Sequence, residues 1–357
     1  MKLQPDSYVA PADSIRAAFA GASSDDVTFL ARQCLEIGAW DHALAICDAL
    51  GDADAPAVTL CRAVATFVAG DGDHALAIVD DLLVRKPNHL SALVVKAQML
   101  VRRGQRAQAL PLLLEVTTRY PDYPGAQGLL ATLLMPGPHY RDVLARMHER
   151  LDPATYVEIG VDTGATLALA RRARVAIGID PEEVPLQHAL TPATRLFRLT
   201  SDAFFAQHSR QSLLGAARVD LGFIDGLHRF EAALRDFANL EAWSHASATL
   251  VLHDCVPLLA RSAARQRATK FWVGDTWKVV RALRVYRPDL RIRTLLTPPS
   301  GLTVVRCLNP DSTLIHDRFS EIVARFMDDR WDAEPGAYMP ELGCVANDEA
   351  GLADVLS

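Results

Sequence analysis

The sequence of 357 residues lacks the features that mark membrane, secreted and nucleic-acid-binding proteins. No apolar run reaches the ~18 residues that a membrane span needs, and the first residues show no apolar core of a signal peptide. The six cysteines form no C-x-x-C pair, which disfavours a zinc site or a disulfide framework. A net charge of −6 argues against a nucleic-acid partner. We therefore expect a cytoplasmic protein, and its length predicts about two domains.

The N-terminal third carries an internal repeat. The hexapeptide DHALAI occurs twice, at Asp41–Ile46 and Asp73–Ile78. A glycine, an alanine and a proline also recur 34 residues apart, as Gly70, Ala75 and Pro87 and then as Gly104, Ala109 and Pro121. Glycine opens a turn between helices, alanine lets paired helices approach, and proline ends the second helix. The pattern resembles the tetratricopeptide repeat and predicts an all-α helical repeat domain over residues 24–135.

Two roles for this repeat domain remain open. Stacked helical repeats bind a peptide or a protein partner in a concave groove, or they brace the rest of the chain or a homo-oligomer of it. The segment 135–138, with the sequence MPGP, is rich in helix breakers and predicts the end of the domain. Residues 1–23 form a separate N-terminal segment in this interpretation.

Residues 155–180, TYVEIGVDTGATLALARRARVAIGID, are the most informative segment of the chain. An apolar run, Tyr156–Ile159, leads into a glycine turn and a helical stretch, and a second run, Val175–Ile179, ends on Asp180. This order predicts a βαβ unit of a nucleotide-binding sheet, with an acid placed to bond a ribose. The turn reads E-x-G-x-x-x-G without a lysine, so it matches neither the dinucleotide pattern nor the P-loop.

The α/β pattern continues beyond this unit. Residues 196–199, 219–225 and 248–253 are further strand-like runs, and residues 290–308 read as two strands joined by a PPSG turn. Polar residues follow several of these runs, at the points where the strands would end. Because the carboxyl ends of parallel strands meet at one edge of a sheet, we expect the functional residues there.

The segments V-E-I-G-x-x-x-G, at residues 157–164, and F-I-D-G-L-H, at residues 223–228, resemble motifs of the class I S-adenosylmethionine (SAM)-dependent methyltransferases. The resemblance is to the small-molecule and sugar O-methyltransferases and covers residues 150 to about 308. It implies a Rossmann-like, seven-stranded sheet, for which we assign a domain over residues 140–310. Residues 311–357 then form a C-terminal helix, about Ser312–Phe326, and an acidic tail.

The resemblance also assigns residues to the cofactor SAM. Its methionine end would contact Glu158, Gly160 and Gly164, and its ribose would bind Asp180. Its adenine would lie against three neighbouring residues, Ser201, Asp202 and Ala203. Asp202 has an alternative role as the cap of the helix that follows. Asp225 would lie beside the methyl donor.

Catalysis in this family uses the histidine of the second motif, which is His228 here. A sugar hydroxyl is a poor nucleophile until its proton is removed, and histidine titrates near neutral pH, so His228 would be the general base. The alternative is a histidine that only makes hydrogen bonds at a helix start. Asp225, His253 and Asp254 would hold a divalent metal such as Mg²⁺ or Mn²⁺. His253 could instead be a second base or an orienting group.

A block of bases and tryptophans, residues 261–278, precedes the final hairpin. Aromatic faces suit sugar rings and cations suit phosphate or carboxylate groups, so Trp272, Trp277 and Lys278 would contact the substrate from a lid. The alternative is a pair of tryptophans that pack in the core, beside a basic face exposed to solvent.

We expect an O-methyltransferase acting on a small molecule or a saccharide. Two rival functions are an inactive SAM-binding scaffold and a protein methyltransferase that holds its target with the repeats.

Overall fold

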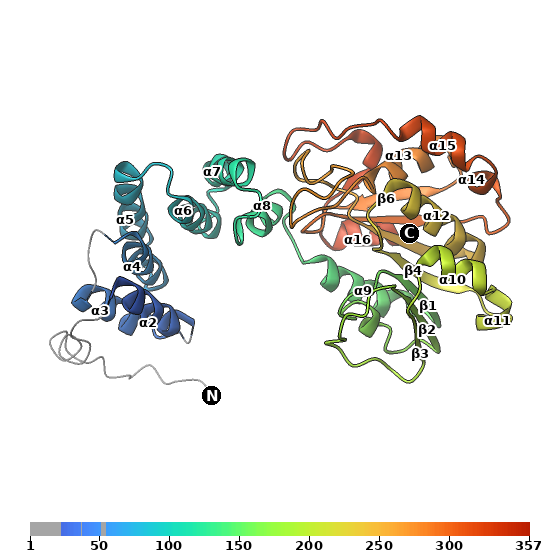
Figure 1. Ribbon diagram of the computed structural model, residues 1–357, viewed down its shortest axis with the longest axis horizontal. Coiled ribbons are helices and arrows are strands. Elements are labelled where there is room, and N and C mark those ends of the chain that lie inside the picture. Colours follow the sequence, from blue (N-terminus) through green and yellow to red (C-terminus); the bar gives the residue numbers. More distant parts are fainter. Residues whose placement is uncertain (1–22, 37, 51–54) are drawn as a thin grey trace. The chain divides into compact units, whose positions relative to one another are not determined.

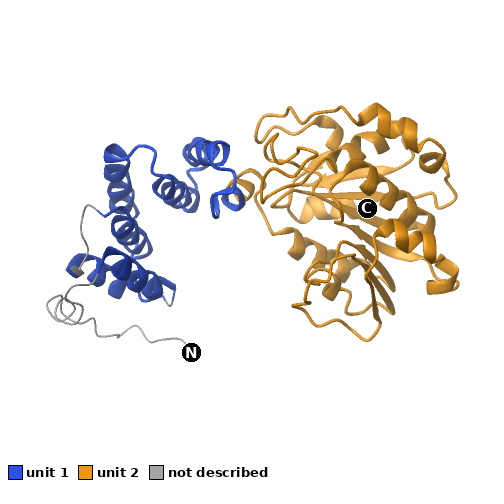
Figure 2. Cartoon of the chain, in the orientation of Figure 1, with its two compact units in different colours: residues 1–129 blue, residues 130–357 orange. Residues whose placement is uncertain are grey.

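The computed structural model describes residues 23–36, 38–50 and 55–357 (Figure 1). The predicted N-terminal segment therefore lies almost entirely outside the described residues. The chain forms two compact units, residues 1–129 and residues 130–357 (Figure 2). Within the described part of the chain, no helix combines the length and the apolar character that crossing a membrane requires.

Unit 1 is all-α and is built from paired helices. These are α2 (Ser24–Glu36), α3 (Trp40–Leu50), α4 (Pro56–Val68), α5 (Gly72–Arg85), α6 (Leu90–Arg102) and α7 (Arg106–Arg119). Helix α8 (Ala126–Leu134) contains the boundary between the units. The repeat glycines adopt left-handed φ values at the turns, 79° for Gly38, 102° for Gly70 and 77° for Gly104. The matching alanines, Ala43, Ala75 and Ala109, are fully buried, which confirms the predicted helical repeat.

Unit 2 contains one eight-stranded sheet in the order β3-β2-β1-β4-β5-β7-β6-β8. The strands are β1 (Thr155–Ile159), β2 (Val175–Ile179), β3 (Thr194–Phe197), β4 (Val219–Ile224), β5 (Ser244–His253), β6 (Arg291–Leu295), β7 (Leu302–Arg306) and β8 (Cys344–Val345). Strands β1 to β5 pair in parallel, and β7 is antiparallel to both neighbours. The predicted Rossmann-like sheet is confirmed, with one strand more than the expected seven. Strand β8 spans two residues, too few to give an alternating pattern.

The connections differ from the prediction at two places. A helix was expected after Gly164, but the chain forms only a 3₁₀ turn, η1 (Leu167–Leu169), before β2 begins. The expected C-terminal helix is divided into α14 (Leu314–Asp317) and α15 (Phe319–Phe326). A short 3₁₀ turn, η2 (Pro340–Leu342), then precedes β8, and α16 (Glu349–Leu356) follows it.

Five further helices complete unit 2. These are α9 (Tyr140–Leu151), α10 (Ser201–Gln207), α11 (Arg210–Leu214), α12 (Phe230–Trp243) and α13 (Trp277–Tyr286). The central strands β1 and β4 are buried apart from the half-buried Asp220, and they deliver Gly160 and Asp225 to one edge of the sheet. Gly160 has a φ of 88°, and a Cβ there would lie 2.0 Å from the carbonyl oxygen of Asp225. Only glycine lets these two strand ends approach so closely.

Candidate active site

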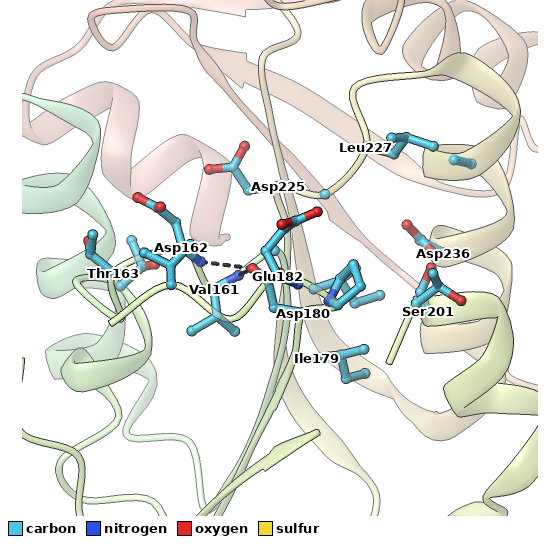
Figure 3. A pocket seen from close by; sticks show the side chains of 18 of the residues that line it. Val161, Asp162, Thr163, Ile179, Asp180, Glu182, Ser201, Asp225, Leu227 and Asp236 are labelled. Atoms are coloured by element: carbon cyan, nitrogen blue, oxygen red, sulfur yellow. Dashed lines mark hydrogen bonds between the residues drawn. The ribbon is translucent and has the colours of Figure 1, made fainter. Parts of the chain in front are cut away.

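A cavity of about 580 Å³ lies at the carboxyl ends of β1, β2 and β4 (Figure 3). Its wall includes residues 159–163 after β1, residues 179–182 after β2, and residues 225–227 after β4. Tyr140 and Arg141, at the start of α9, also line it, and no sequence pattern pointed to them. The predicted meeting place of the strand ends is therefore a hollow large enough to hold a small molecule.

Residues 160–164, here called the glycine loop, are fixed by the acid at the end of β2. One carboxylate oxygen of Asp180, Oδ2, accepts hydrogen bonds from the backbone N–H groups of Val161 (2.7 Å) and Asp162 (2.9 Å) (Figure 3). Its other oxygen accepts one from Glu182 (2.8 Å). A carboxylate offers about four acceptor positions, so Oδ1 of Asp180, which lines the cavity, retains capacity for a ligand hydroxyl.

Glu158 supports the glycine loop from inside the protein. Its carboxyl is fully buried and accepts hydrogen bonds from the hydroxyls of Tyr156 (2.6 Å) and Thr166 (2.7 Å). Burial raises the pKa of Glu158 to about 8. Gly160 lines the cavity, but Glu158 and Gly164 do not. Glu158 therefore lies beneath the glycine loop.

A second group of polar residues lines the opposite side of the cavity. Ser201 and Asp202, at the start of α10, both face it, whereas Ala203 does not. The cap of α10 is Thr200, whose hydroxyl accepts from the N–H of Ala203 (3.2 Å), so Asp202 is not the capping residue. Asp202 instead pairs with Arg235 (2.8 Å). Asp236 of α12 also lines the cavity; its only signal in the sequence is an acid among apolar neighbours.

The carboxylate–histidine cluster, formed by Asp225, His228, His253, Asp254 and Ser300, lies beside the cavity. Nε2 of His228 is 2.9 Å from Asp254 and 3.3 Å from Asp225. Nδ1 of His253 is 3.1 Å from Asp225, and its Nε2 is 3.2 Å from the hydroxyl of Ser300. Ser300 also donates to Asp254. The structure therefore unites the predicted catalytic and metal residues, and Ser300 is an addition that no motif indicated.

Both ring nitrogens of His228 face oxygen acceptors. Nδ1 is 3.0 Å from the carbonyl oxygen of Trp272, and Nε2 faces the two carboxylates. Burial alone would lower the pKa of His228, but the charges and hydrogen bonds of Asp254 and Asp225 outweigh it and raise this pKa well above its usual value. In this arrangement the ring donates from both nitrogens and carries a positive charge.

Three members of the cluster offer metal-ligand atoms within 4.8 Å of one another: Asp225, His253 and Asp254. Two carboxylates and one imidazole suit a divalent cation such as Mn²⁺, Fe²⁺ or Zn²⁺ better than Mg²⁺, which prefers oxygen ligands alone. The ring of Tyr140 stacks on His253 with centroids 4.1 Å apart, so the imidazole is held in a fixed orientation.

Two of the three predicted substrate contacts are in the protein core. Trp277 is fully buried against Trp331. Lys278 is buried and donates to the carbonyl oxygen of Met327 (2.6 Å). Neither side chain can reach a substrate, because both lie on the buried face of α13. The predicted lid would have exposed that face. Trp272 is half-buried beside His228, with ring centroids 5.5 Å apart.

Comparisons with known proteins give one family match and several similar solved structures. Residues 157–255 match the family model of a methyltransferase domain. No curated protein sequence matches the chain. Similar solved structures include the O-methyltransferase TomG from Streptomyces achromogenes in complex with SAM (13% identity, covering 56% of this chain and 96% of that one, TM-score 0.38). Others are the O-methyltransferase from Bacillus cereus in complex with SAH (10%, 56% and 99%, TM-score 0.34) and MamA from Desulfovibrio magneticus RS-1 (27%, 31% and 66%, TM-score 0.26).

The parallel sheet, the glycine loop and the cavity at the strand ends define unit 2 as a Rossmann-like α/β domain of the nucleotide-binding kind. The family match over residues 157–255 makes this assignment specific. Unit 2 contains a methyltransferase domain over residues 157–255, as the motifs predicted, and the chain also carries helical repeats.

Proposed function

We propose that this protein transfers a methyl group from SAM to a hydroxyl oxygen of a small molecule or a saccharide. The observation that carries the proposal is the cavity between the glycine loop and the carboxylate–histidine cluster. It places a wall suited to a nucleoside beside a group of side chains suited to proton transfer. The family match over residues 157–255 supports the reaction class.

The residues of the cavity fit SAM. The backbone of residues 160–163 lines the part of the cavity where the methionine end would lie. Asp180 would accept a hydrogen bond from the ribose through Oδ1, and Ser201 and Asp202 would face the base. When bound, SAM supplies an activated methyl group on its sulfonium sulfur. Asp225, at the junction of the cavity and the cluster, would lie beside that methyl group.

His228 would act as the general base for the acceptor hydroxyl. Nε2 can accept the proton only in the neutral ring, so the proton that it now directs at Asp254 and Asp225 must first leave to one of these carboxylates or to solvent. A hydroxyl placed between Asp225 and His228 would compete for those contacts. Holding the oxygen in line with the methyl group would supply much of the remaining rate enhancement.

A divalent metal at Asp225, His253 and Asp254 is part of the proposal. Bound there, it would act as a Lewis acid toward an acceptor oxygen. The residues would then lose their mutual hydrogen bonds, since His253 now contacts both Asp225 and Ser300. Those same contacts support the alternative that His253 only orients Asp225. Activity that survives exhaustive treatment with EDTA would decide for the alternative.

Calorimetric titration of SAM into the purified protein tests the cofactor assignment. We expect binding in the micromolar range, with affinity strongly reduced in Asp180→Ala, because this change removes the acceptor of two N–H groups of the glycine loop and of the N–H of Glu182. Thermal melting of the ligand-free variant shows whether it is folded. Absence of SAM binding by the wild type would contradict the proposal and leave a scaffold acting through its helical repeats as the better interpretation.

A further inference from the structure

Asp236 is a buried acid in the cavity wall that the proposed function leaves without a role. Only 1% of its surface is exposed, yet it lines the cavity. Its Oδ1 atom has no hydrogen-bond partner among the described residues. Figure 3 shows its side chain next to Ser201.

The position of Asp236 in α12 gives no structural reason for an acid. Its helix neighbours Phe237 and Leu234 are fully buried apolar residues. An unsatisfied buried polar atom destabilises the folded protein, and burial raises the pKa of Asp236 to about 7. An apolar side chain would serve the fold better, so the carboxyl is retained at a cost that a ligand can offset.

The neighbouring acid, Asp202, is in a different state. Its side chain is 56% exposed and pairs with Arg235 at 2.8 Å. Its charge is therefore already balanced at the rim of the cavity. Asp236 has no such ion pair among the described residues and lies deeper. Gly226 leaves the approach to Asp236 open, since even a Cβ at that glycine would be 3.7 Å from Oδ2.

We propose that Asp236, and not Asp202, recognises the exocyclic amine of the purine base of the bound cofactor. Its unpartnered Oδ1 accepts a hydrogen bond from the amine, and Ser201 lies next to the carboxyl. The proposal rests on the assignment of SAM to this cavity. It makes Asp236 the residue that distinguishes an adenine from a purine with a carbonyl at the same position, because a carboxylate repels that carbonyl oxygen.

The test compares two ligands by calorimetric titration at pH 8.5. One is S-adenosylhomocysteine, and the other is S-inosylhomocysteine, in which a carbonyl replaces the amine. We expect the wild type to prefer the adenosyl compound by about 10- to 100-fold, as for a hydrogen bond to a charged group. In Asp236→Asn the amide can turn its NH₂ group toward a carbonyl, so the preference falls to about threefold or less. The matched variant Asp202→Asn keeps the wild-type ratio.

Each outcome bears on a different claim. A wild-type protein that binds neither ligand overturns the proposed function and this inference together. A protein that binds S-adenosylhomocysteine, but whose preference survives in Asp236→Asn, overturns the inference alone. Should Asp236→Asn fail to fold, Asp236→Leu replaces it, because a buried leucine suits α12 and is expected to melt no lower than the wild type. Loss of the preference in a folded Asp236→Leu supports the inference, and its retention overturns it.

Discussion

The glycine loop and the carboxylate–histidine cluster meet at Asp225, but they are held in place by different kinds of contact. The loop is fixed by backbone N–H groups that donate to one side chain, Asp180. The cluster is fixed by side chains that bond to one another, with His228 and His253 between two carboxylates. The loop therefore keeps its shape without a ligand, whereas the cluster contacts are made largely by side chains that could also bind a substrate or a metal.

This difference suggests that the two regions have separable tasks. The glycine loop suits a constant ligand, such as a cofactor, because its backbone is held in one geometry by a single acceptor, Asp180. A cluster of titratable groups suits the chemical step, because its members can exchange partners and protons. Variants in one region should then leave the function of the other largely intact, and the predictions below test that separation.

The largest effect is expected from His228→Ala. Removing the base should reduce turnover by about 10²- to 10⁴-fold, measured as S-adenosylhomocysteine released with an acceptor found by screening sugars and small hydroxyl compounds. SAM affinity should change little, because His228 does not line the cavity. Lower turnover with unchanged SAM affinity would show that the substitution affects the cluster and not the cofactor site.

A matched control is available in His245→Ala. His245 also pairs with an aspartate, Asp220, at 2.9 Å, but lies outside the cavity wall. It should keep wild-type turnover. If His228→Ala also kept it, the base assignment would be wrong; if SAM affinity fell in parallel with turnover, the two regions would not be separable.

Gly160→Ala should break the separation, because this residue joins both regions. Its Cβ would lie 2.0 Å from the carbonyl oxygen of Asp225, so the loop and the end of β4 must move apart. We expect SAM affinity to fall by about 100-fold, the size of effect that a displacement of about 1 Å produces in a preorganised site. Calorimetry gives the affinity and thermal melting gives the accompanying loss of stability.

The control for backbone strain is Gly104→Ala. Gly104 has a similar φ of 77°, and a Cβ there would meet nothing within 4 Å. Gly104→Ala therefore places an alanine in the left-handed region, with the same backbone strain, but its Cβ overlaps no other atom. SAM affinity should be unchanged. Equal affinities for the Gly160→Ala variant and the wild type would show that the strand ends can separate without harm.

The same contrast explains what the sequence could predict. Asp180 and Gly160 belong to one continuous stretch with strand, turn and strand in order, so local pattern was sufficient for them. Ser300 and Tyr140 reach the cluster from segments on either side of it in the chain, and nothing local marks such residues.

Asp236 was missed because one acid within an amphipathic helix resembles an ordinary surface residue. Trp277 and Lys278 were misplaced because composition does not reveal which face of α13 is buried.

The smallest effect concerns Glu158, which the sequence assigned to the cofactor and the structure places beneath the loop. Its pKa of about 8 in the folded protein lies above the usual value of 4.5 because the carboxyl is buried. A raised carboxyl pKa contributes stability that is fully present below pH 4.5 and is lost as pH rises toward 8. Glu158→Gln cannot ionise, so it should lack this loss. Relative to the variant, the wild type should lose about 2 kcal/mol of unfolding free energy between pH 5 and pH 7.

Urea denaturation of both proteins at pH 5, 7 and 9 measures this difference directly. The exposed Glu149, on α9, supplies the control variant Glu149→Gln, which should follow the wild type at every pH. SAM affinity of Glu158→Gln should remain close to that of the wild type, because the amide oxygen can accept from one of the hydroxyls of Tyr156 and Thr166 while the NH₂ group donates to the other. A pH dependence identical in wild type and Glu158→Gln would show that the carboxyl is ionised when buried. A large loss of SAM affinity would instead return Glu158 to the cofactor site, and the glycine loop would then depend on a second carboxyl besides that of Asp180.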